Sequence, residues 1–451
     1  MTVKTIKQAV LRKIKPTAEE ENKVGAFTAR LLSVTKTVSK LEGAMCGSIG
    51  KHTWLRGDHD VDLFIMFPAS ASRDELEKKG LEFGKQIAKQ INGATIIKYA
   101  EHPYLRARTP DFLVDIVPCY RIAPGEKIKS AVDRSPLHRD YVLKKLPAEF
   151  RDEVRLVKQF CKGAGVYGSD AKNRGFSGYT CELLAINYGK LENLLKAAAA
   201  WKPPVKIDIE NAGTASKFAD PLVIVDPVDP ERNVAANLGA ENFVKFVRAA
   251  VSFIARPDDS YFSLHGLFLG KEELQKLKER GTLFAVLKMK KPDVIEDTLY
   301  PQLRKTAKRI EAMLEKEEFS VLRSFAFSGD DMCIIMEMNV WQQPPVKKMP
   351  GPEIFSAKHV REFTGKYGKS EFPPYIEENQ WFAEKQRQFR DAVSLLKGIV
   401  SKKPEELAMP THIAKPLHDA TLLQGDEFWK TVTKHRELSA FLRRKYFEKL
   451  A

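Results

Sequence analysis

The sequence has 451 residues, which is enough for about three domains of ordinary size. Its 74 Lys and Arg residues against 59 Asp and Glu residues give a net charge of +15, and 43% of the residues are hydrophobic. This composition excludes a disordered or fibrous protein. No apolar stretch approaches about 18 residues and the N-terminal sequence lacks the apolar core of a secretory signal, so we expect a cytoplasmic protein with no membrane span.

The excess of positive charge suits a polyanionic partner, and nucleic acid is the leading candidate. At this point a merely solubilising basic surface explains the charge equally well. The cysteines are scattered and include no C-x-x-C pair: Cys46, Cys119, Cys161, Cys181 and Cys333. This pattern favours buried thiols over a disulfide framework or a zinc site.

The N-terminal part of the chain predicts helices followed by a small mixed sheet. Apolar residues at helical spacing predict two helices within residues 1–40. A β-branched and aromatic run at residues 61–67 predicts a strand, residues 74–91 a helix, and residues 94–100 and 112–120 further strands. This order indicates a small α/β domain.

The middle of the chain is predicted to be mainly helical. Helices are expected from about Phe150 to Gly163, in one segment from about Gly178 to Trp201, and over residues 241–255. A Pro- and Asp-rich connection fills residues 203–237. We expect this part to be a helical domain of its own.

The third region alternates strand and helix. Residues 284–290 predict a strand, residues 298–317 a helix, and residues 321–328 and 332–341 two more strands. Strand, helix, strand, strand in this order suggests a ferredoxin-like α/β unit. Mixed short helices with several Pro breaks are expected after residue 351.

Three aspartates on two predicted strands carry the most chemical information. Asp60 and Asp62 lie two residues apart at the start of a strand, so their side chains share one face. Asp115 interrupts an apolar run, where an unpaired carboxylate is costly. Such carboxylates repel unless a cation lies between them, and oxygen ligands suit Mg²⁺. The three can hold two metal ions; the alternative is an acidic turn in which Asp58 is a cap and Asp60 is solvated.

A turn at Gly47 and Ser48 precedes the aspartates. Glycine permits close backbone approach, and Ser48, Lys51 and Thr53 offer donors to phosphate oxygens. The sequence contains no G-x-x-x-x-G-K-[ST] loop. A Gly-Ser turn alone is weak evidence, but followed by D-x-D and a later strand aspartate it is a strong signal.

These residues resemble the DNA polymerase β-like nucleotidyltransferase superfamily, whose signature is a Gly-Ser turn, a D/E-x-D strand and a third carboxylate. The chain from Gly47 to about Leu303 is also similar, block by block, to the archaeal-type class I CCA-adding tRNA nucleotidyltransferases. The blocks are GSIGKHTWLRGDHDVDLFIMFP, EHPYLRAR, VDIVPCY, SAVDRSPLH, EVRLVKQFCKGAGVYG, RGFSGYTCELL, VDPVDPERNVAANL and KPDVIEDTLYPQL. The resemblance is thinner after Leu303.

The resemblance implies a multi-domain α/β and α enzyme. Residues 1–145 would form a polymerase β-like nucleotidyltransferase head, 146–260 a helical, nucleotide-binding neck, 261–350 a ferredoxin-like body, and 351–451 a tail with a C-terminal tRNA-binding region. It further implies template-independent addition of C, C and A to the 3′ end of tRNA, from CTP and ATP.

The resemblance also assigns site residues. Asp60, Asp62 and Asp115 would be the catalytic residues and would bind two Mg²⁺ ions. The expected nucleotide-binding residues are Gly47, Ser48, Lys51, His138, Lys158, Tyr167 and Arg232. Within this set, His138, Lys158 and Tyr167 match positions that contact phosphates and sugar, and Arg232 matches the arginine that faces the incoming base.

Two positions depart from the family, and several have structural alternatives. Asp60 stands where the family often has Glu, and Lys51 where it often has Arg, so Lys51 would bind phosphate as a point charge. Without the resemblance, Lys158 is better explained as a solvated helix lysine and Tyr167 as a core aromatic residue. A helix cap explains His138 equally well, and a structural hydrogen bond accounts for the histidine of EHPY at least as well as nucleotide selection.

Two basic segments are candidate tRNA surfaces. Arg304 and Lys308, with Lys305 and Arg309, form basic rows on a helix whose other face is apolar. The stretch from Lys430 to the end carries seven Lys and Arg residues against two Glu residues, with interleaved aromatics. Either could track RNA backbone by shape. A solvated charged face is the alternative for both.

Two other functions stay open on the sequence. One is a related transferase that adds only adenosine, such as a poly(A) polymerase or an oligoadenylate synthetase. The other is a catalytically silent RNA-binding protein on the same fold, against which the three aspartates argue, because binding alone gives no reason to retain their repulsion. The sequence is also compatible with a homodimer.

Overall fold

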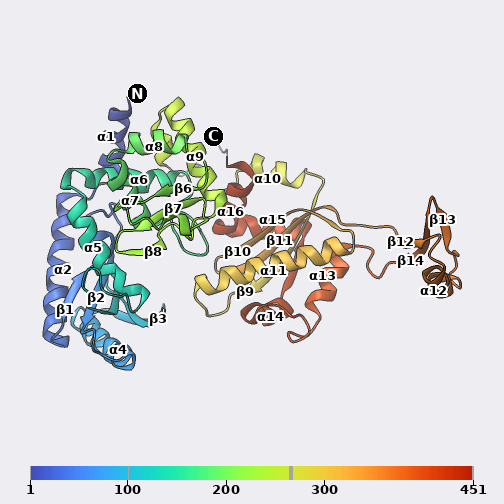
Figure 1. The fold of residues 1–451 in the computed structure, drawn as a ribbon, viewed down its shortest axis with the longest axis horizontal. Helices are drawn as coiled ribbons and strands as arrows, with labels where there is room; N and C mark the ends of the chain where they lie inside the picture. The colour runs from blue at the N-terminus through green and yellow to red at the C-terminus, as the bar shows by residue number, and fades with distance from the viewer. Residues whose placement is uncertain (1, 100, 264–267, 449–451) are drawn as a thin grey trace. The chain divides into compact units, whose positions relative to one another are not determined.

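The computed structural model describes residues 2–99, 101–263 and 268–448, which divide into two compact units (Figure 1). The first unit ends at residue 263 of the described chain and the second begins at residue 268. The predicted head and neck fall in the first unit, and the predicted tail and nearly all of the body fall in the second. The finer division into four parts stays a prediction.

Two helices open the first unit, as the sequence predicted: α1 (Val3–Ile14) and α2 (Ala18–Ser39). Thr17 and Glu20 cap α2 reciprocally, each side chain accepting a hydrogen bond from the backbone of the other. A five-stranded sheet follows in the order β1-β2-β5-β4-β3. Its strands are β1 (Glu42–Met45), β2 (Asp60–Phe67), β3 (Ala94–Tyr99), β4 (Pro103–Arg108) and β5 (Leu113–Tyr120).

The predicted strands β2, β3 and β5 are confirmed, except that Ala100 lies outside the described residues. The sequence analysis missed β1 and β4, which are short and carry few β-branched residues. The predicted helix is α4 (Arg73–Gln90), and a one-turn helix α3 (Gly47–Gly50) forms at the Gly-Ser turn. α4 packs closely on the sheet, because a Cβ atom at Gly80 would lie 2.6 Å from Pro118.

Helices dominate the rest of the first unit. They are α5 (Arg134–Lys145), α6 (Arg151–Gly163), α7 (Gly178–Tyr188), α8 (Leu191–Ala199) and α9 (Ala240–Ala255). The apolar face predicted for α6 is buried: Val154, Val157 and Cys161 are at most 1% exposed. Val157 and Cys161 join one core with α1 and α7 to α9, and Val154 joins a smaller cluster with residues of α5 and α7.

Two expectations for this part were wrong. The single helix expected from Gly178 to Trp201 is two helices, because Gly189 adopts a φ of +71° between α7 and α8. The connection at residues 203–237 contains a small sheet in the order β6-β7-β8: β6 (Val205–Ile207), β7 (Leu222–Asp226) and β8 (Asp229–Asn233). Its strands have only three to five residues and are separated by Pro- and Asp-rich turns. Such short runs give no clear strand pattern in the sequence.

The second unit contains an antiparallel sheet in the order β10-β11-β9-β15. Its elements are β9 (Leu283–Lys290), α11 (Glu296–Lys316), β10 (Ser320–Ser328), β11 (Asp331–Val340) and β15 (Thr421–Gln424). The predicted order of strand, helix, strand, strand is confirmed, and β15 beside β9 completes a ferredoxin-like arrangement. This fourth strand comes from the segment that the sequence analysis assigned to the tail.

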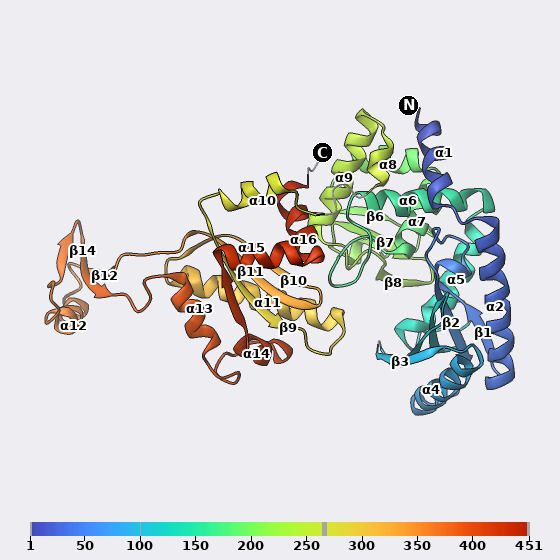
Figure 2. The same ribbon diagram turned by 180° about the vertical axis from the view of Figure 1, so that it is seen from behind.

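Helices cover both faces of this sheet (Figure 2). Alternate residues of β9 point to opposite faces, so Leu287 joins a core with α11, α13 (Ala392–Val400) and α14 (Thr411–His418). Val286 joins a second core with α10 (Lys271–Lys278), α15 (Gly425–Lys434) and α16 (Arg436–Phe447). Shared cores therefore bind the body and much of the tail together.

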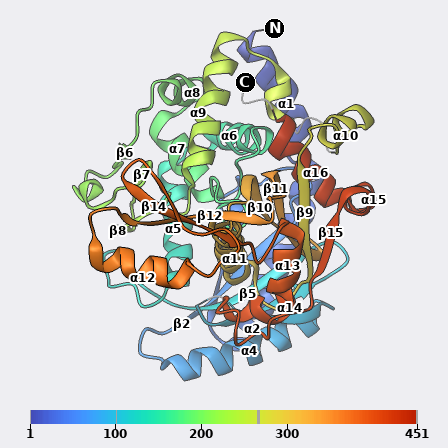
Figure 3. The same ribbon diagram turned by 90° about the vertical axis from the view of Figure 1, so that its right-hand side faces the viewer.

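A second, small sheet lies within the same unit, in the order β12-β14-β13. Its strands are β12 (Val346–Glu353), β13 (Tyr375–Glu377) and β14 (Gln380–Gln386). The helix α12 (Ala357–Tyr367) lies beside them in Figure 1, and Figure 3 shows α12 from another side. None of the helices in the described part of the chain has the length and apolar character needed to span a membrane.

Candidate active site

A cavity of about 520 Å³ in the first unit gathers most of the predicted site residues. Those that line it are Gly47, Ser48, Lys51, Asp60, Asp62, Asp115, Lys158 and Tyr167. It is also lined by residues that the sequence analysis did not select for the site: Asp58, Arg106, Lys162, Tyr179 and Glu182. His138 and Arg232 do not line it.

The carboxylates meet because β2 and β5 are parallel neighbours. Their register places Asp62 directly opposite Asp115, while Val61 and Val114 alternate into the core. Burial and the charges of Asp115 and Asp60 together raise the pKa of Asp62 to about 6. The structure thus brings these carboxylates together at one cavity.

Arg106 on β4 neutralises one of them. Its Nε and Nη2 donate to the two carboxylate oxygens of Asp115 at 2.6 and 2.7 Å, a bidentate pair. The antiparallel register of β4 and β5 places these residues opposite each other. Among the described residues, no group of three or more His, Cys, Asp or Glu side chains is arranged to hold a metal ion.

The donor set nevertheless fits a hard divalent cation. Asp60, Asp62 and Asp115 offer only oxygen atoms, and a cation between them would relieve their repulsion. Gly47 has a φ of +60°, and a Cβ atom there would lie 1.8 Å from Oδ2 of Asp62. Only glycine allows the turn to approach this carboxylate so closely.

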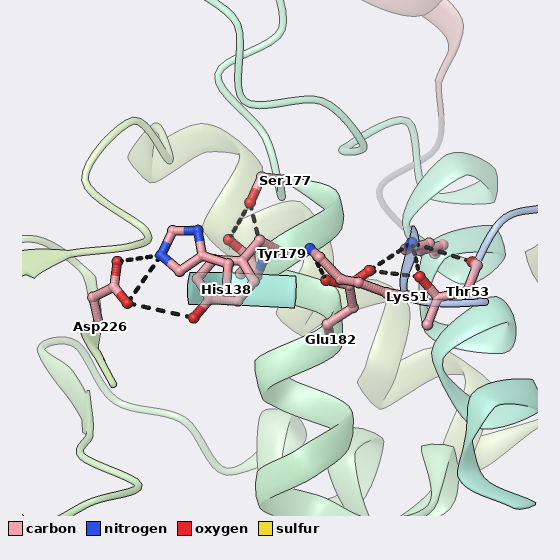
Figure 4. A network of polar contacts seen from close by, with 9 residues as sticks. Lys51, Thr53, His138, Ser177, Tyr179, Glu182 and Asp226 are labelled. Atoms are coloured by element: carbon pink, nitrogen blue, oxygen red, sulfur yellow. Dashed lines mark hydrogen bonds and ion pairs between the residues drawn. The ribbon is translucent and has the colours of Figure 1, made fainter. Parts of the chain in front are cut away.

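A buried network of lysines forms another wall of the cavity (Figure 4). Glu182 on α7 accepts hydrogen bonds from Lys51 and from the Thr53 hydroxyl, each at 2.6 Å. Lys158 on α6 donates to the same carboxylate at 3.2 Å. Lys158 is therefore a buried, ion-paired residue and not the solvated lysine that the structural alternative described.

His138 and Arg232 meet at a second buried carboxylate, Asp226 at the end of β7. Figure 4 shows the contact of His138 with Asp226. His138 Nε2 lies 2.9 Å from its Oδ2, and Arg232 Nη1 donates to the same oxygen at 2.7 Å. Burial lowers the pKa of His138, although Asp226 opposes that shift. The ring of His138 stacks on the ring of Tyr179, with 3.9 Å between the ring centroids. Because Tyr179 also lines the cavity, it connects the cluster around Asp226 to the cavity wall.

Three residues that support the predicted site were missed: Arg106, Glu182 and Asp226. Each is the counter-ion of a residue that was selected. A signal existed for Glu182, the one charged residue in the apolar run CELLA, where a lone carboxylate requires a partner. Arg106 and Asp226 offered no comparable local signal.

His102 is 5% exposed, and neither ring nitrogen has a hydrogen-bond partner among the described residues. The structural hydrogen bond considered for it is therefore not seen in this part of the chain. A buried imidazole without partners is unusual in a folded protein.

The predicted tRNA-binding residues lie on α11 in the second unit. The apolar face opposite them is buried, as expected: Leu303, Ala307, Ile310 and Leu314 are at most 3% exposed. Lys305 and Lys308 are exposed, whereas the guanidinium of Arg304 lies 5.4 Å from the ring of Tyr300. Arg309 is exposed and donates to the carbonyl of Ala408 at 2.5 Å. Lys305 and Lys308 are the more accessible pair.

Known sequence families match successive parts of the chain. The family described as "Nucleotidyltransferase domain" matches residues 31–138, "tRNA nucleotidyltransferase, second domain" matches residues 152–263, and "CCA-adding enzyme, C-terminal domain" matches residues 280–425. Among solved structures, the Cid1 poly(U) polymerase with magnesium and 3′-dATP matches 57% of this chain and 98% of its own at 14% identity, with a TM-score of 0.46.

Curated relatives match the chain over nearly its whole length. The CCA-adding enzyme of Methanocaldococcus jannaschii is 36% identical over 92% of this chain and 94% of its own. The enzyme of Methanosarcina barkeri is 38% identical over 92% and 91%, and that of Methanosarcina acetivorans 40% over 87% and 88%. Together with the family matches along the chain, these likenesses show that the chain belongs to the archaeal CCA-adding enzyme family of nucleotidyltransferases.

Proposed function

We propose that this protein adds C, C and A to the 3′ end of tRNA, taking CTP and ATP as substrates and using no template. The observation that carries the proposal is the cavity of the first unit. One wall presents carboxylates and another presents lysines, which is the polarity that transfer of a nucleotide from a triphosphate requires. Family membership over most of the chain selects CCA addition among such transfers.

In this proposal Asp60, Asp62 and Asp115 hold two Mg²⁺ ions. The chemistry that bound Mg²⁺ supplies is activation of the tRNA 3′ hydroxyl and neutralisation of charge on the departing pyrophosphate. Because Arg106 occupies both oxygens of Asp115 here, this carboxylate must loosen that ion pair to serve as a ligand.

The lysine wall would bind the triphosphate. Lys51 and Lys158 line the cavity beside Tyr167, and Lys162 adds a further ammonium group that the sequence analysis did not select. Phosphoryl transfer asks a protein mainly for positioning and charge neutralisation, so fixed ammonium groups opposite the carboxylates fulfil that role.

Arg232 would face the incoming base. Its guanidinium presents planar donors that match the acceptors of cytosine and adenine, whereas uracil offers an N3–H donor where cytosine offers an acceptor. The pair with Asp226 supports this role, since it restrains the guanidinium before a base arrives. Asp226 also holds His138, so one carboxylate would orient both residues.

The exposed basic side chains of α11 would bind the backbone of tRNA, and Lys305 and Lys308 are the best placed of the four predicted residues. We further propose that the protein acts in the cytoplasm, where its substrates are available. Homodimer formation stays a prediction, and sedimentation equilibrium of the full chain would test it.

An extension assay tests the function. Transcripts of tRNA that end before CCA, after C, and after CC are incubated with each labelled nucleotide separately. We expect C on the first two and A on the third, with little UTP or GTP incorporation. Addition of adenosine alone to all three would favour the poly(A)-type transferase, and RNA binding with no addition would favour the silent RNA-binding protein.

A further inference from the structure

Glu182 is a buried carboxylate for which the nucleotidyl transfer described above assigns no role. It is 1% exposed and is joined by hydrogen bonds to side chains from two other parts of the first unit (Figure 4). Lys51 follows the one-turn helix α3, which also carries the Gly-Ser turn, and Lys158 lies on α6. One carboxylate therefore connects the turn beside Asp62 to two helices of the neighbouring helical core.

Lys51 and Lys158 share a single carboxylate, and their side chains are 8% and 2% exposed. Burial acts to raise the pKa of Glu182, but the two ammonium groups outweigh it and lower this pKa to about 2. Glu182 thus stays ionised at neutral pH, whereas burial and the charge of Lys51 lower the pKa of Lys158. The carboxylate is therefore the group that keeps both ammonium groups in place.

The carboxylates on the facing side of the cavity compete for the same lysines. Lys51 already acts electrostatically on Asp62, whose pKa it helps to lower against the larger effects of burial and neighbouring carboxylates. A flexible lysine in this cavity would be drawn into an ion pair with Asp62. The short hydrogen bond from Lys51 to Glu182 holds the ammonium group on the lysine side of the cavity. The carboxylate of Asp62 therefore stays available to bind a cation.

We propose that Glu182 is the positioning residue of the triphosphate site, holding the ammonium groups of Lys51 and Lys158 where the phosphates of the incoming nucleotide bind. The inference rests on the proposed function, because it concerns the same cavity. Donors that are fixed before binding lose less conformational entropy when the phosphates arrive. The Thr53 hydroxyl, 2.6 Å from Oε1 of Glu182 and 3.0 Å from Lys158, completes the support.

Glu182→Gln tests the inference, because it removes the charge and keeps the shape. We expect KM for CTP and for ATP to rise about tenfold to a hundredfold, while kcat changes less than about fivefold and KM for tRNA does not change. Inorganic tripolyphosphate carries the phosphates without base or sugar, so its inhibition constant is expected to rise by the same factor as KM.

Glu337→Gln in the second unit is a matched control. Glu337 is also fully buried and accepts hydrogen bonds from Arg280, Thr282 and Tyr446 at 2.6 to 2.9 Å. Glu337→Gln removes a negative charge from an equally buried position, but Glu337 does not line the cavity of the first unit. KM for CTP should therefore not change in this variant. Thr53→Val is a second test variant that leaves both lysines paired, and it should raise KM about threefold to tenfold.

An unchanged KM in a folded Glu182→Gln enzyme would overturn the inference, as would a raised KM with an unchanged tripolyphosphate inhibition constant. If Glu182→Gln fails to fold, Thr53→Val provides the test. An unchanged KM for CTP in Thr53→Val would also contradict the inference. Direct calorimetric binding of tripolyphosphate to wild-type and variant protein gives the same comparison without catalysis. It therefore tests the role of Glu182 even if the extension assay contradicts CCA addition.

Discussion

Replacing Gly47 with alanine tests whether the turn before β2 sets the position of Asp62. A Cβ atom at Gly47 would lie 1.8 Å from Oδ2 of Asp62 and 2.8 Å from its Cγ, whereas real Cβ contacts stay above 3.0 Å. The turn or the carboxylate must therefore move by about 1 Å, and a displacement of that size costs about 100-fold in rate at a catalytic centre. We expect kcat for CTP addition to fall at least about 100-fold.

Gly57→Ala separates this steric effect from backbone strain. Gly57 also has a positive φ, +80°, but a Cβ atom there would meet no atom within 4 Å. Both variants carry the conformational cost of a left-handed alanine, about 1–2 kcal/mol of unfolding free energy. Only Gly47→Ala displaces Asp62, so Gly57→Ala should retain nearly full activity.

Single-nucleotide extension rates and thermal unfolding of both variants give the comparison. The reasoning is refuted if Gly47→Ala retains more than about a tenth of wild-type kcat, because the Asp62 carboxylate would then tolerate the displacement. Equal losses in both variants would also refute it, since strain alone would explain them.

The charges of the site and of α11 lead to three further predictions. Because the pKa of Asp62 is about 6 in the folded protein and near 4 in the unfolded chain, ionisation of this carboxylate weakens the fold as pH rises. In EDTA, Asp62→Asn should therefore raise the free energy of unfolding by about 1–3 kcal/mol at pH 7.5 and by about a third as much at pH 4.5, as measured by urea unfolding. Arg232→Ala should reduce kcat/KM for CTP and ATP far more than for UTP. The preference for CTP and ATP over UTP should thereby fall by about 1–3 kcal/mol per lost contact. Lys305→Glu with Lys308→Glu should raise KM for tRNA and reduce its dependence on salt concentration.

Each of these has a control and a contrary outcome. For Asp62→Asn, equal stabilisation at both pH values would show that the carboxylate charge is not the cause. Equal proportional losses for CTP, ATP and UTP would mean that Arg232 supports the fold or binds phosphate. Lys85→Glu with Lys89→Glu on α4 makes the same charge change on another exposed helix face; if it alters the salt dependence as much as the α11 pair does, α11 is not a specific tRNA surface.

In the five-stranded sheet, β2, β5 and the covering helix α4 could be predicted because their patterns are long and local. The strands β2 and β5 have eight residues each, and α4 has 18. The short strands could not be predicted, for the opposite reason. β6 and β15 have three and four residues, and each depends on a partner strand distant in sequence that no local pattern reveals. Gly189 was overlooked because one glycine in a helical pattern does not by itself end a helix.

In the candidate site, too, residues with a local sequence signal could be predicted, whereas residues that depend on distant strands could not. Asp62 and Asp115 could be selected because a carboxylate in an apolar strand is conspicuous in the sequence. Their juxtaposition required only that the two strands be parallel neighbours. Arg106, in contrast, belongs to a strand that was not predicted, so its pairing with Asp115 could not be foreseen.

The missed residues have a common physical origin. Asp62 and Lys51 are of opposite charge and line one cavity, and such groups would neutralise each other if nothing held them apart. The structure provides a separate counter-ion on the lysine side, Glu182, and one on the carboxylate side, Arg106. A sequence motif records the groups that meet the substrate, whereas the groups that keep them apart lie on other elements and become visible only once those elements are packed together. It follows that variants of these counter-ions should change the affinity for substrate charges more than they change the fold.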